Sequence, residues 1–364
     1  MFAIAKQEFI RGLQLVQGIA DSKNLLSVLG NVLLRTCGNS VLTISATDLT
    51  VSATCELKAN VKSDVSFMLN AKEFYSFVSS CPGPEITVKR LDNNWAEIRS
   101  GKTFFKLAGM PDKDFPKIPD VGAATFASVE TAPLREMIDR TLFSVCLDES
   151  RFHLTGVLLE CAGTKARMVS TDGQRLSKAE RTLSSSIGEF GIIIPKKGVV
   201  ELKRLFANAP SCSLVKSGEN LFVSHESTRL AIKLISGQFP PYEQVIPKEF
   251  KRTITLDRTP LQDVLRRALL VAPEATGIRL TSGDGAIVIG SYNGSTSEFR
   301  EDLEADTSGG PITVALNPKY LSEPLAQMSA KRVMLLLGTD IDPVAIKPAD
   351  PSDDFVGIVM PMRT

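Results

Sequence analysis

The chain has 364 residues, of which 43% are hydrophobic and 23% are charged, and its formal net charge is +1. This length predicts two or three domains with sizeable cores, and the balanced charge by itself indicates neither a nucleic-acid binder nor a surface that attracts acidic partners. No stretch reaches the roughly 20 apolar residues of a membrane span, and no export signal is visible, so we expect a cytoplasmic protein.

The residue types that usually hold metals are few or scattered. The two histidines, His153 and His225, are too few for a histidine-based metal site or catalytic triad. The cysteines are far apart, no pair has CxxC spacing, and we expect free thiols. They are Cys37, Cys55, Cys81, Cys146, Cys161 and Cys212. We therefore expect no metal and no cofactor.

In chain order, the first predicted elements are a short strand from Phe2 and an amphipathic helix over residues 6–19, where apolar residues recur every three or four positions. The run "GNVLLRTCGNSVLTISATDL", which begins at Gly30, alternates apolar and polar residues around a turn, and this predicts a hairpin. Another strand then leads into a helix over residues 72–80.

The same patterns recur twice more along the chain. Openings like the first begin again at Thr125 and Arg252, and each is followed by a hairpin pattern. The closing strand-and-helix pattern aligns Lys72, Lys197 and Lys319, which are 125 and 122 residues apart. These echoes predict three copies of a β-rich unit, each with two helices, and hence an α+β fold. The later helices are expected over residues 133–144, 196–208, 260–271 and 318–332.

Two segments rich in proline separate the copies. "PDKDFPKIPDVGAA" covers residues 111–124, and "SGQFPPYEQVIPKEF" covers residues 236–250. Such segments are extended and fairly stiff. The expected domains are therefore 1–122, 123–249 and 250–364.

Motifs that could carry catalysis are weak. The "GKT" at residues 101–103 lacks the earlier glycine of a phosphate loop, because that position is Ala96, and strand-like residues follow it. The "GDG" at residues 283–285 is typical of a hairpin turn. Asp48 and Asp172 each follow a strand, where an aspartate that accepts backbone hydrogen bonds is commoner than a catalytic acid. We therefore expect that the protein is not an enzyme.

Charge is unevenly distributed between the predicted helices and the rest of the chain. The helices carry 14 Lys or Arg residues and 7 Asp or Glu residues, so they are basic and the remainder is acidic. Solvated helix faces would account for this, and so would one shared surface that faces a polyanion. Because few aromatic residues accompany the basic ones, a duplex backbone is a better match than single-stranded bases.

Several segments resemble the β subunit of bacterial DNA polymerase III, the sliding clamp family. The resemblance runs in order from Phe2 to Thr364 and is carried by "VLGNVLLRT", "SRFHLTGVLLE", "STDGQRLSKAE", "SGQFPPYEQVIP" and "VMPMRT". It implies three clamp domains per chain and a head-to-tail homodimer that forms a six-domain ring around duplex DNA. The implied role is processivity for the replicative polymerase, with no catalysis. Implied partners are this polymerase, the clamp loader, repair polymerases and other proteins with a clamp-binding motif.

The resemblance also implies site residues at matching positions. A pocket for partner peptides would involve Leu154, Thr171, Gly173, Gln174, Arg175, Leu176, Pro240, Val245, Ile341, Pro343, Ile358, Met360 and Met362, with Arg151, Asn317 and Tyr320 at its margin. DNA-binding positions would be Lys23, Lys72, Phe152, His153, Lys197, Lys203 and Arg204, and Leu270 and Val271 would lie at the dimer interface. Departures from the family pattern occur at Asp148, Gln174, Pro241 and Pro343.

Alternatives remain for the apolar tail and for the whole chain. The ending "FVGIVMPMRT" is either a buried last strand or apolar surface kept for a partner, and simple core packing is the plainer explanation for Ile358, Met360 and Met362. Three repeats could also form a binding scaffold unrelated to DNA. An enzyme that uses Asp172 is a more distant alternative.

Overall fold

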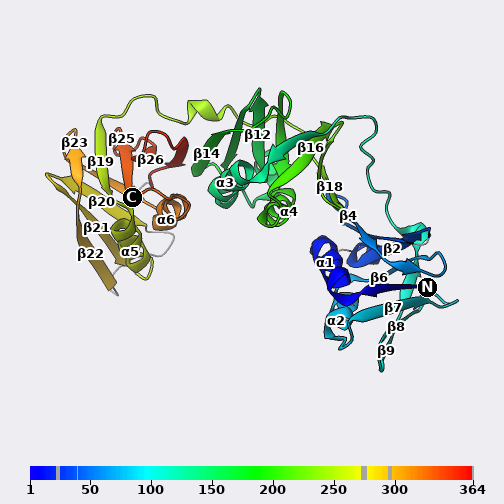
Figure 1. Cartoon of the computed structure of the whole chain (residues 1–364). Coiled ribbons are helices and arrows are strands. Elements are labelled where there is room, and N and C mark those ends of the chain that lie inside the picture. The colour runs from blue at the N-terminus through cyan, green and yellow to red at the C-terminus, as the bar shows by residue number, and fades with distance from the viewer. Residues whose placement is uncertain (22–24, 39, 272–276, 294–296, 363–364) are drawn as a thin grey trace. The chain divides into compact units, whose positions relative to one another are not determined.

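The computed structural model describes residues 1–21, 25–38, 40–271, 277–293 and 297–362 (Figure 1). These residues fall into two compact units. The first comprises 1–132 and 200–234, and the second comprises 133–199 and 235–364. Among the described residues, no helix is long and apolar enough to cross a membrane.

The first unit contains two sheets and the helices α1 (Lys6–Gln17) and α2 (Ala71–Ser80). A five-stranded sheet has the order β5 (Asn60–Val61), β1 (Phe2–Ala5), β7 (Glu85–Arg90), β8 (Ala96–Ser100), β9 (Thr103–Leu107). A nine-stranded sheet has the order β10 (Gly109–Pro111), β6 (Ser66–Asn70), β2 (Asn31–Cys37), β3 (Val41–Thr47), β4 (Val51–Lys58), β18 (Thr228–Lys233), β17 (Asn220–His225), β16 (Ser211–Ser217), β11 (Ala127–Glu130).

Aromatic side chains form the centre of this unit. The ring of Phe9 on α1 meets Phe2 at 6.0 Å and Phe74 at 5.4 Å, both edge to face, and all three side chains are fully buried. Strands β4 and β18 pair over residues 51–55 and 228–232, so the long sheet continues from the first repeat into the second.

The second unit also contains two sheets, together with the helices α5 (Arg258–Ala268) and α6 (Pro318–Ala326). A nine-stranded sheet has the order β15 (Phe190–Pro195), β12 (Gly156–Ala162), β13 (Lys165–Thr171), β14 (Arg175–Thr182), β27 (Phe355–Val359), β26 (Val344–Pro348), β25 (Arg332–Leu337), β19 (Arg252–Asp257), β23 (Asp306–Ser308). A four-stranded sheet has the order β22 (Ser297–Glu304), β21 (Ala286–Asn293), β20 (Ile278–Gly283), β24 (Ile312–Leu316).

The remaining helices connect or flank these strands. Helices α3 (Thr131–Thr141) and α4 (Lys196–Ala207) each have residues in both units. The short 3-10 helices are η1 (Ser27–Gly30), η2 (Asp112–Asp114), η3 (Leu142–Ser144), η4 (Glu149–Leu154) and η5 (Tyr242–Gln244). The predicted order of strand, helix, hairpin, strand and helix is thus confirmed in all three repeats.

The predicted turns are also confirmed. The helices α1, α3, α4 and α5 end one to three residues before their predicted ends, and one helix end is wrong by more. Strand β9 follows Gly101, and the β20–β21 turn places Gly285 at φ +75°, a conformation that favours glycine. Helix α6 ends at Ala326, whereas the sequence predicted a helix to Arg332. In β25 the residues from Val333 to Leu337 are all apolar, and every second one is buried (Val333, Leu335 and Leu337), so sheet pairing overrides the helix.

Candidate functional site

A tight turn between β13 and β14 forms one wall of the candidate site. Asp172 accepts hydrogen bonds at Oδ1 from the backbone N–H of Gln174 (2.9 Å) and of Arg175 (3.0 Å). The hydroxyl of Thr171 donates to the carbonyl of Arg175 at 2.6 Å, and Gly173 adopts φ +89°. The carboxylate of Asp172 therefore closes the turn, the more frequent of the two roles that the sequence allowed.

Arg175 ties this turn to helix α6. Its Nε donates to Asp172 Oδ2 at 3.0 Å, its Nη2 donates to the carbonyl of Phe143 at 2.7 Å, and its guanidinium also pairs with Glu323. The guanidinium carbon lies 4.4 Å from the centre of the Tyr320 ring. Only 10% of the Arg175 side chain is exposed. Arg175 thus has a structural role, because its contacts join the β13–β14 turn to helix α6.

A cleft of about 670 Å³ opens beside Arg175. Six predicted peptide-site residues line it, together with Phe143, Leu147, Lys196, Lys319 and Glu323; the six are Arg151, Gly173, Gln174, Arg175, Asn317 and Tyr320. Tyr320 donates its hydroxyl to Gln174 Oε1 at 2.9 Å, so a side-chain hydrogen bond crosses the site.

The segment before β12, which includes η4, also lines the cleft and contacts the β13–β14 turn. Arg151 donates to the carbonyl of Asp172 at 2.6 Å and pairs with Asp148 at 3.1 Å. Asp148 also accepts bonds from the hydroxyl and backbone N–H of Ser150, and these bonds lower the pKa of its carboxyl group. Its charge is therefore already engaged within the loop.

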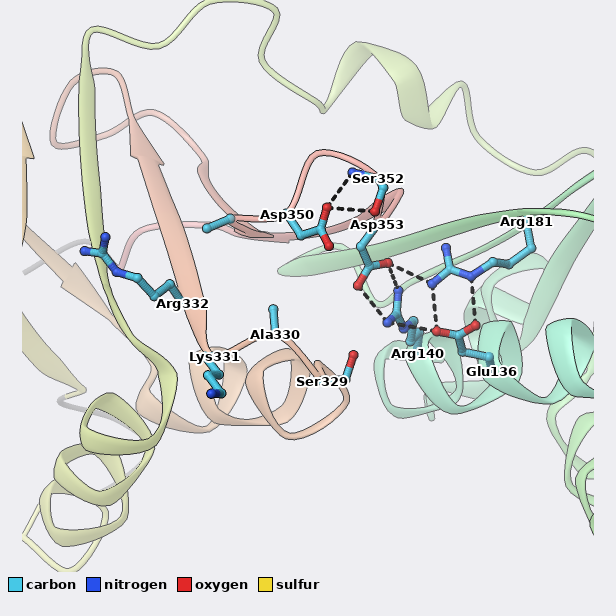
Figure 2. A pocket seen from close by; sticks show the side chains of 11 residues that line it. Glu136, Arg140, Arg181, Ser329, Ala330, Lys331, Arg332, Asp350, Ser352 and Asp353 are labelled. Carbon is cyan, nitrogen blue, oxygen red and sulfur yellow. Dashed lines mark hydrogen bonds and ion pairs between the residues drawn. The ribbon is translucent and has the colours of Figure 1, made fainter.

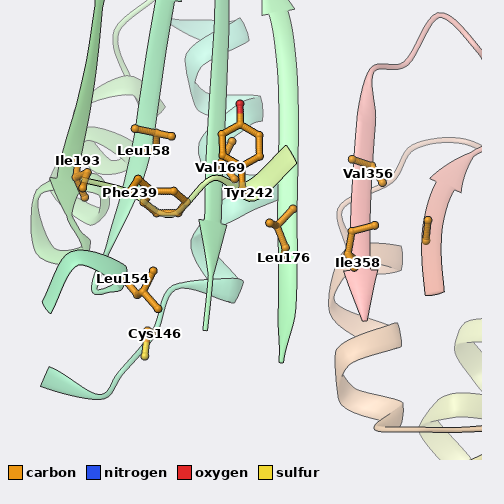
Figure 3. Close-up of a cluster of buried hydrophobic side chains, with 11 residues drawn as sticks. Cys146, Leu154, Leu158, Val169, Leu176, Ile193, Phe239, Tyr242, Val356 and Ile358 are labelled. Atoms are coloured by element: carbon orange, nitrogen blue, oxygen red, sulfur yellow. The ribbon is translucent and has the colours of Figure 1, made fainter. Parts of the chain in front are cut away.

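An apolar cluster adjoins the cleft, since Cys146 belongs to both, and Figure 3 shows its side chains directed at one another. The cluster comprises Cys146, Leu154, Leu158, Val169, Leu176, Ile193, Phe239, Tyr242, Ala345, Val356 and Ile358. Three predicted peptide-site residues belong to it and are at most 6% exposed: Leu154, Leu176 and Ile358. Side chains this buried can form the floor of a groove but offer little surface for contact.

Other predicted peptide-site residues are accessible. Val245 is 41% exposed, Ile341 76% and Met360 37%, while Thr171, Pro240, Pro343 and Met362 are half-buried. The backbone N–H of Met360 donates to the carbonyl of Gln174 at 2.9 Å. Each explanation for the apolar tail therefore applies to part of it. All of β27 is a buried last strand, whereas Met360, directly after it, is partly exposed to solvent.

The structure adds two aromatic residues that the sequence did not single out. Phe239 and Tyr242, from the proline-rich linker, are buried in the cluster. The hydroxyl of Tyr242 donates to Glu160 at 2.6 Å and accepts from Arg167 at 2.8 Å. The sequence did contain a signal for these two residues, because large aromatic side chains in an extended, proline-rich linker are expected to pack against a neighbouring apolar surface.

The predicted DNA-binding residues lie on two helices and one loop. Lys72 is exposed on α2, and Lys197, Lys203 and Arg204 lie on α4. In the loop, Phe152 is 54% exposed and its ring meets that of His153 edge to face at 5.5 Å. Lys23 lies outside the described residues. Within their observed bounds the six described helices carry 13 basic and 7 acidic residues, so the helical excess of positive charge persists.

Among the described residues, each of the four sheets is open and ends in edge strands, and two of these edge strands matter for the association of subunits. These are β9 in the first unit and β22 in the second. Leu270, predicted at a subunit interface, is 85% exposed, and Val271 is half-buried. Edges of this kind are sites at which another chain can add.

Comparisons with known proteins cover the whole chain. Family models described as the N-terminal, central and C-terminal domains of the DNA polymerase III beta subunit match residues 1–119, 128–241 and 243–363.

Relatives named "Beta sliding clamp" include one from Vibrio cholerae, 30% identical, and one from Pseudomonas putida, 29% identical; each alignment covers 100% of this chain and 99% of the relative. Among solved structures, the DNA polymerase III beta chain of Streptococcus pneumoniae has a TM-score of 0.95 at 26% identity. The match covers 100% of this chain and 99% of the Streptococcus pneumoniae chain. The DNA polymerase III subunit beta of Pseudomonas aeruginosa has a TM-score of 0.93 at 27% identity, with 100% of both chains covered.

Proposed function

Because this chain belongs to the DNA polymerase III beta subunit family, we propose that two copies join head to tail into a closed ring around duplex DNA. The protein is a three-domain DNA sliding clamp that serves a DNA polymerase and is not itself an enzyme. A scaffold unrelated to DNA and an enzyme based on Asp172 are both set aside by this membership. The ring would act in the cytoplasm and keep the replicative polymerase on its template.

The observation that carries the ring proposal is the opposite charge of two open strand edges. On β9, Lys106 is exposed, and Lys102 precedes the strand in the adjoining turn. On β22, Glu298, Asp302 and Glu304 are exposed, with Arg300 as the one exposed basic residue among them. An acidic edge of one copy is complementary to a basic edge of the next, and strand addition would join the five-stranded and four-stranded sheets into one.

Apolar groups accompany these charges. Phe104 on β9 is 46% exposed, with the Arg99 guanidinium 4.9 Å from its ring centre, and Leu270 next to α5 is 85% exposed. An interface between different patches on two identical chains closes into a ring when its rotation closes. We propose that Leu270 and Val271 pack against the first repeat of the partner copy.

A closed ring needs little affinity for the duplex it surrounds. Topology prevents dissociation, so a modest excess of positive charge on the helices suffices to keep the duplex centred. Phosphate contacts of this kind do not depend on sequence. Lys72, Lys197, Lys203 and Arg204 are the proposed contributors, with Phe152 and His153 in the neighbouring loop.

We further propose that the surface above the apolar cluster binds short peptides from partner proteins. The partners would be the replicative polymerase, the clamp loader, repair polymerases and other proteins with a clamp-binding motif. The exposed Met360 and its flexible thioether suit a surface that repacks around different ligands. Burial of roughly 400 Å² of apolar surface would contribute about 10 kcal/mol before ordering and association costs. The remainder corresponds to roughly micromolar affinity, which suits partners that exchange.

Linearisation of loaded DNA tests the encircling mechanism. The clamp is loaded with its clamp loader onto nicked circular DNA, the loader is removed, and half of the sample is cut at a single site. We expect the clamp to remain on intact circles and to leave cut molecules through their ends, as measured by gel filtration. Equal retention on circular and cut DNA would falsify the ring.

A further inference from the structure

The pairing of β14 with β27 joins the second and third repeats, and its two ends differ. At one end, Arg175 pairs with Val359, next to the proposed peptide groove. At the other end, Ala179 pairs with Phe355, and the backbone N–H of Glu180 donates to the carbonyl of Asp354 at 3.0 Å. Four residues of strand separate the ends, a distance of about 13 Å.

A cluster of four charged side chains holds the end that is remote from the groove (Figure 2). We call this cluster the clasp, and it consists of Glu136 and Arg140 on α3, Arg181 on β14, and Asp353 in the loop before β27. Arg181 donates to both oxygens of Glu136 at 2.8 and 2.7 Å and to Asp353 at 2.8 Å. Arg140 donates to Asp353 Oδ2 at 2.9 Å and pairs with Glu136 at 2.9 Å.

The clasp is largely removed from water. The side chain of Arg140 is 3% exposed, that of Asp353 is 14% exposed, and the guanidinium carbon of Arg140 lies 5.1 Å from the centre of the Phe355 ring. Burial opposes ionisation of Asp353, but hydrogen bonds from Arg140 and Arg181 outweigh it and lower the pKa of this carboxyl. Charged pairs in such surroundings are little screened by salt, and removal of one partner leaves the others uncompensated.

At this end of the strand pair Ala179 and Phe355 are buried, whereas the clasp itself borders an open space. A cavity of about 560 Å³ lies beside the clasp, and its other wall is formed by Ser329, Ala330, Lys331 and Arg332. Figure 2 shows the side chains of Lys331 and Arg332 directed away from the clasp. Arg332 instead pairs with Asp306 at 2.5 Å and Asp257 at 3.7 Å. Neither of these two basic side chains is therefore placed to replace a lost clasp residue.

We propose that the clasp positions the peptide groove from its far side by holding β27 in register on β14. Both walls of the groove depend on this register, because Gln174 precedes β14 and Met360 follows β27. A slip of one residue would turn Ile358 away from the apolar cluster. None of the four clasp residues lines the cleft beside Gln174, so they act through the strands. This inference rests on the peptide groove proposed above.

The substitution Asp353→Asn tests the clasp, because it keeps the side-chain shape and removes one charge. Binding of a fluorescein-labelled peptide that carries the clamp-binding segment of the same organism's replicative polymerase is measured by fluorescence anisotropy. We expect roughly tenfold weaker binding, within the range by which residues remote from a ligand modulate affinity. Glu136→Gln, a milder change at a more exposed position, is expected to weaken binding less.

Hydrogen exchange of the backbone amides provides a second readout. In the Asp353→Asn variant we expect faster exchange over residues 355–359 and unchanged exchange in β17. The matched control is Asp263→Asn, which removes an exposed ion pair with Arg266 at 3.1 Å on α5 and should change neither readout.

Each outcome bears on a different statement. If the unmodified protein does not bind the peptide, the proposed groove is wrong, while exchange over residues 355–359 still tests whether the clasp holds the register. If both clasp variants fold and match the unmodified protein in peptide affinity and in exchange, the clasp does not position the groove. Tight peptide binding by Asp353→Asn despite faster exchange would equally overturn the inference.

Discussion

Asp48 and Asp172 occupy equivalent turns in the first and second repeats and perform the same local task. Asp48 accepts hydrogen bonds at Oδ1 from the backbone N–H groups of Thr50 (2.9 Å) and Val51 (2.6 Å). Asp172 accepts the corresponding pair and, in addition, the bond from Arg175 Nε. Asp172 therefore closes its turn and also supports the candidate site through Arg175.

Alanine substitution at these two positions should separate the two tasks. Asp48→Ala is expected to lower the free energy of unfolding by about 1 kcal/mol, and Asp172→Ala by about 2 kcal/mol, because the latter also leaves a buried guanidinium short of an acceptor. Chemical denaturation measures both. Only Asp172→Ala should weaken binding of the polymerase peptide, and equal effects of the two variants on peptide affinity would contradict this assignment.

At this scale the sequence was informative about turns and uninformative about partners. The residue types in "STDG" were enough to predict that Asp172 closes a turn. The contacts of Arg175 with Glu323 and Tyr320 were not predictable, because they join segments more than 140 residues apart. The clasp is a clearer case, since Arg140 and Asp353 are 213 residues apart.

Among the elements, hydrophobic periodicity predicted the helices and hairpins well, and sheet membership poorly. The last strand shows why. Its five residues are all buried, so its sequence lacks the alternation that marks a strand with one exposed face. Its place between β14 and β26 depends on both neighbours, and a single sequence does not show which strands those are.

The open strand edges lead to a prediction about subunit association. Replacing Lys102 and Lys106 with Glu should weaken self-association at least tenfold, since it would place like charges opposite Asp302 and Glu304 of the other copy. Sedimentation at several protein concentrations measures this. Restoring opposite charges with Asp302→Lys and Glu304→Lys in the same chain should recover part of the lost affinity.

A control variant separates edge charge from total charge. Lys113 is exposed on η2, outside β9, and Lys113→Glu should leave self-association unchanged. High salt should reduce the difference between the edge variant and the unmodified protein, because exposed charges are screened. Unaltered association in the Lys102 and Lys106 double variant would place the interface elsewhere.

For the whole molecule, the central question is whether charge or closure holds the clamp on DNA. The repeat spacing predicted three copies of one unit, and the three family models confirm three domains. A polyanion partner was one of the two explanations for the basic helices, and membership of the sliding clamp family agrees with DNA as that partner. Ring closure itself could be reached only through the resemblance, because no residue pattern within one chain specifies how two copies meet.

Removal of positive charges from the helices distinguishes retention by a closed ring from retention by phosphate contacts. In a Lys197→Ala, Lys203→Ala double variant we expect an unchanged lifetime on uncut circular DNA and faster one-dimensional diffusion, because fewer phosphate contacts oppose sliding. Single-molecule tracking measures both. Lys233→Ala, at an exposed position on β18, serves as the control. A lifetime on circles that falls sharply in the double variant would show that phosphate contacts, and not closure, retain the protein.

The eight residues of β22 also matter before any ring exists. A newly made chain exposes this long strand with its outer edge open, and such edges invite identical molecules to stack into fibres. The strand carries four carboxylates, of which Glu301 is paired with Arg267, and one guanidinium from Arg300, so it keeps a net negative charge and two copies of β22 should repel each other. The negative charge of the strand can thus protect an unassembled chain from stacking with identical strands before it associates with a complementary edge.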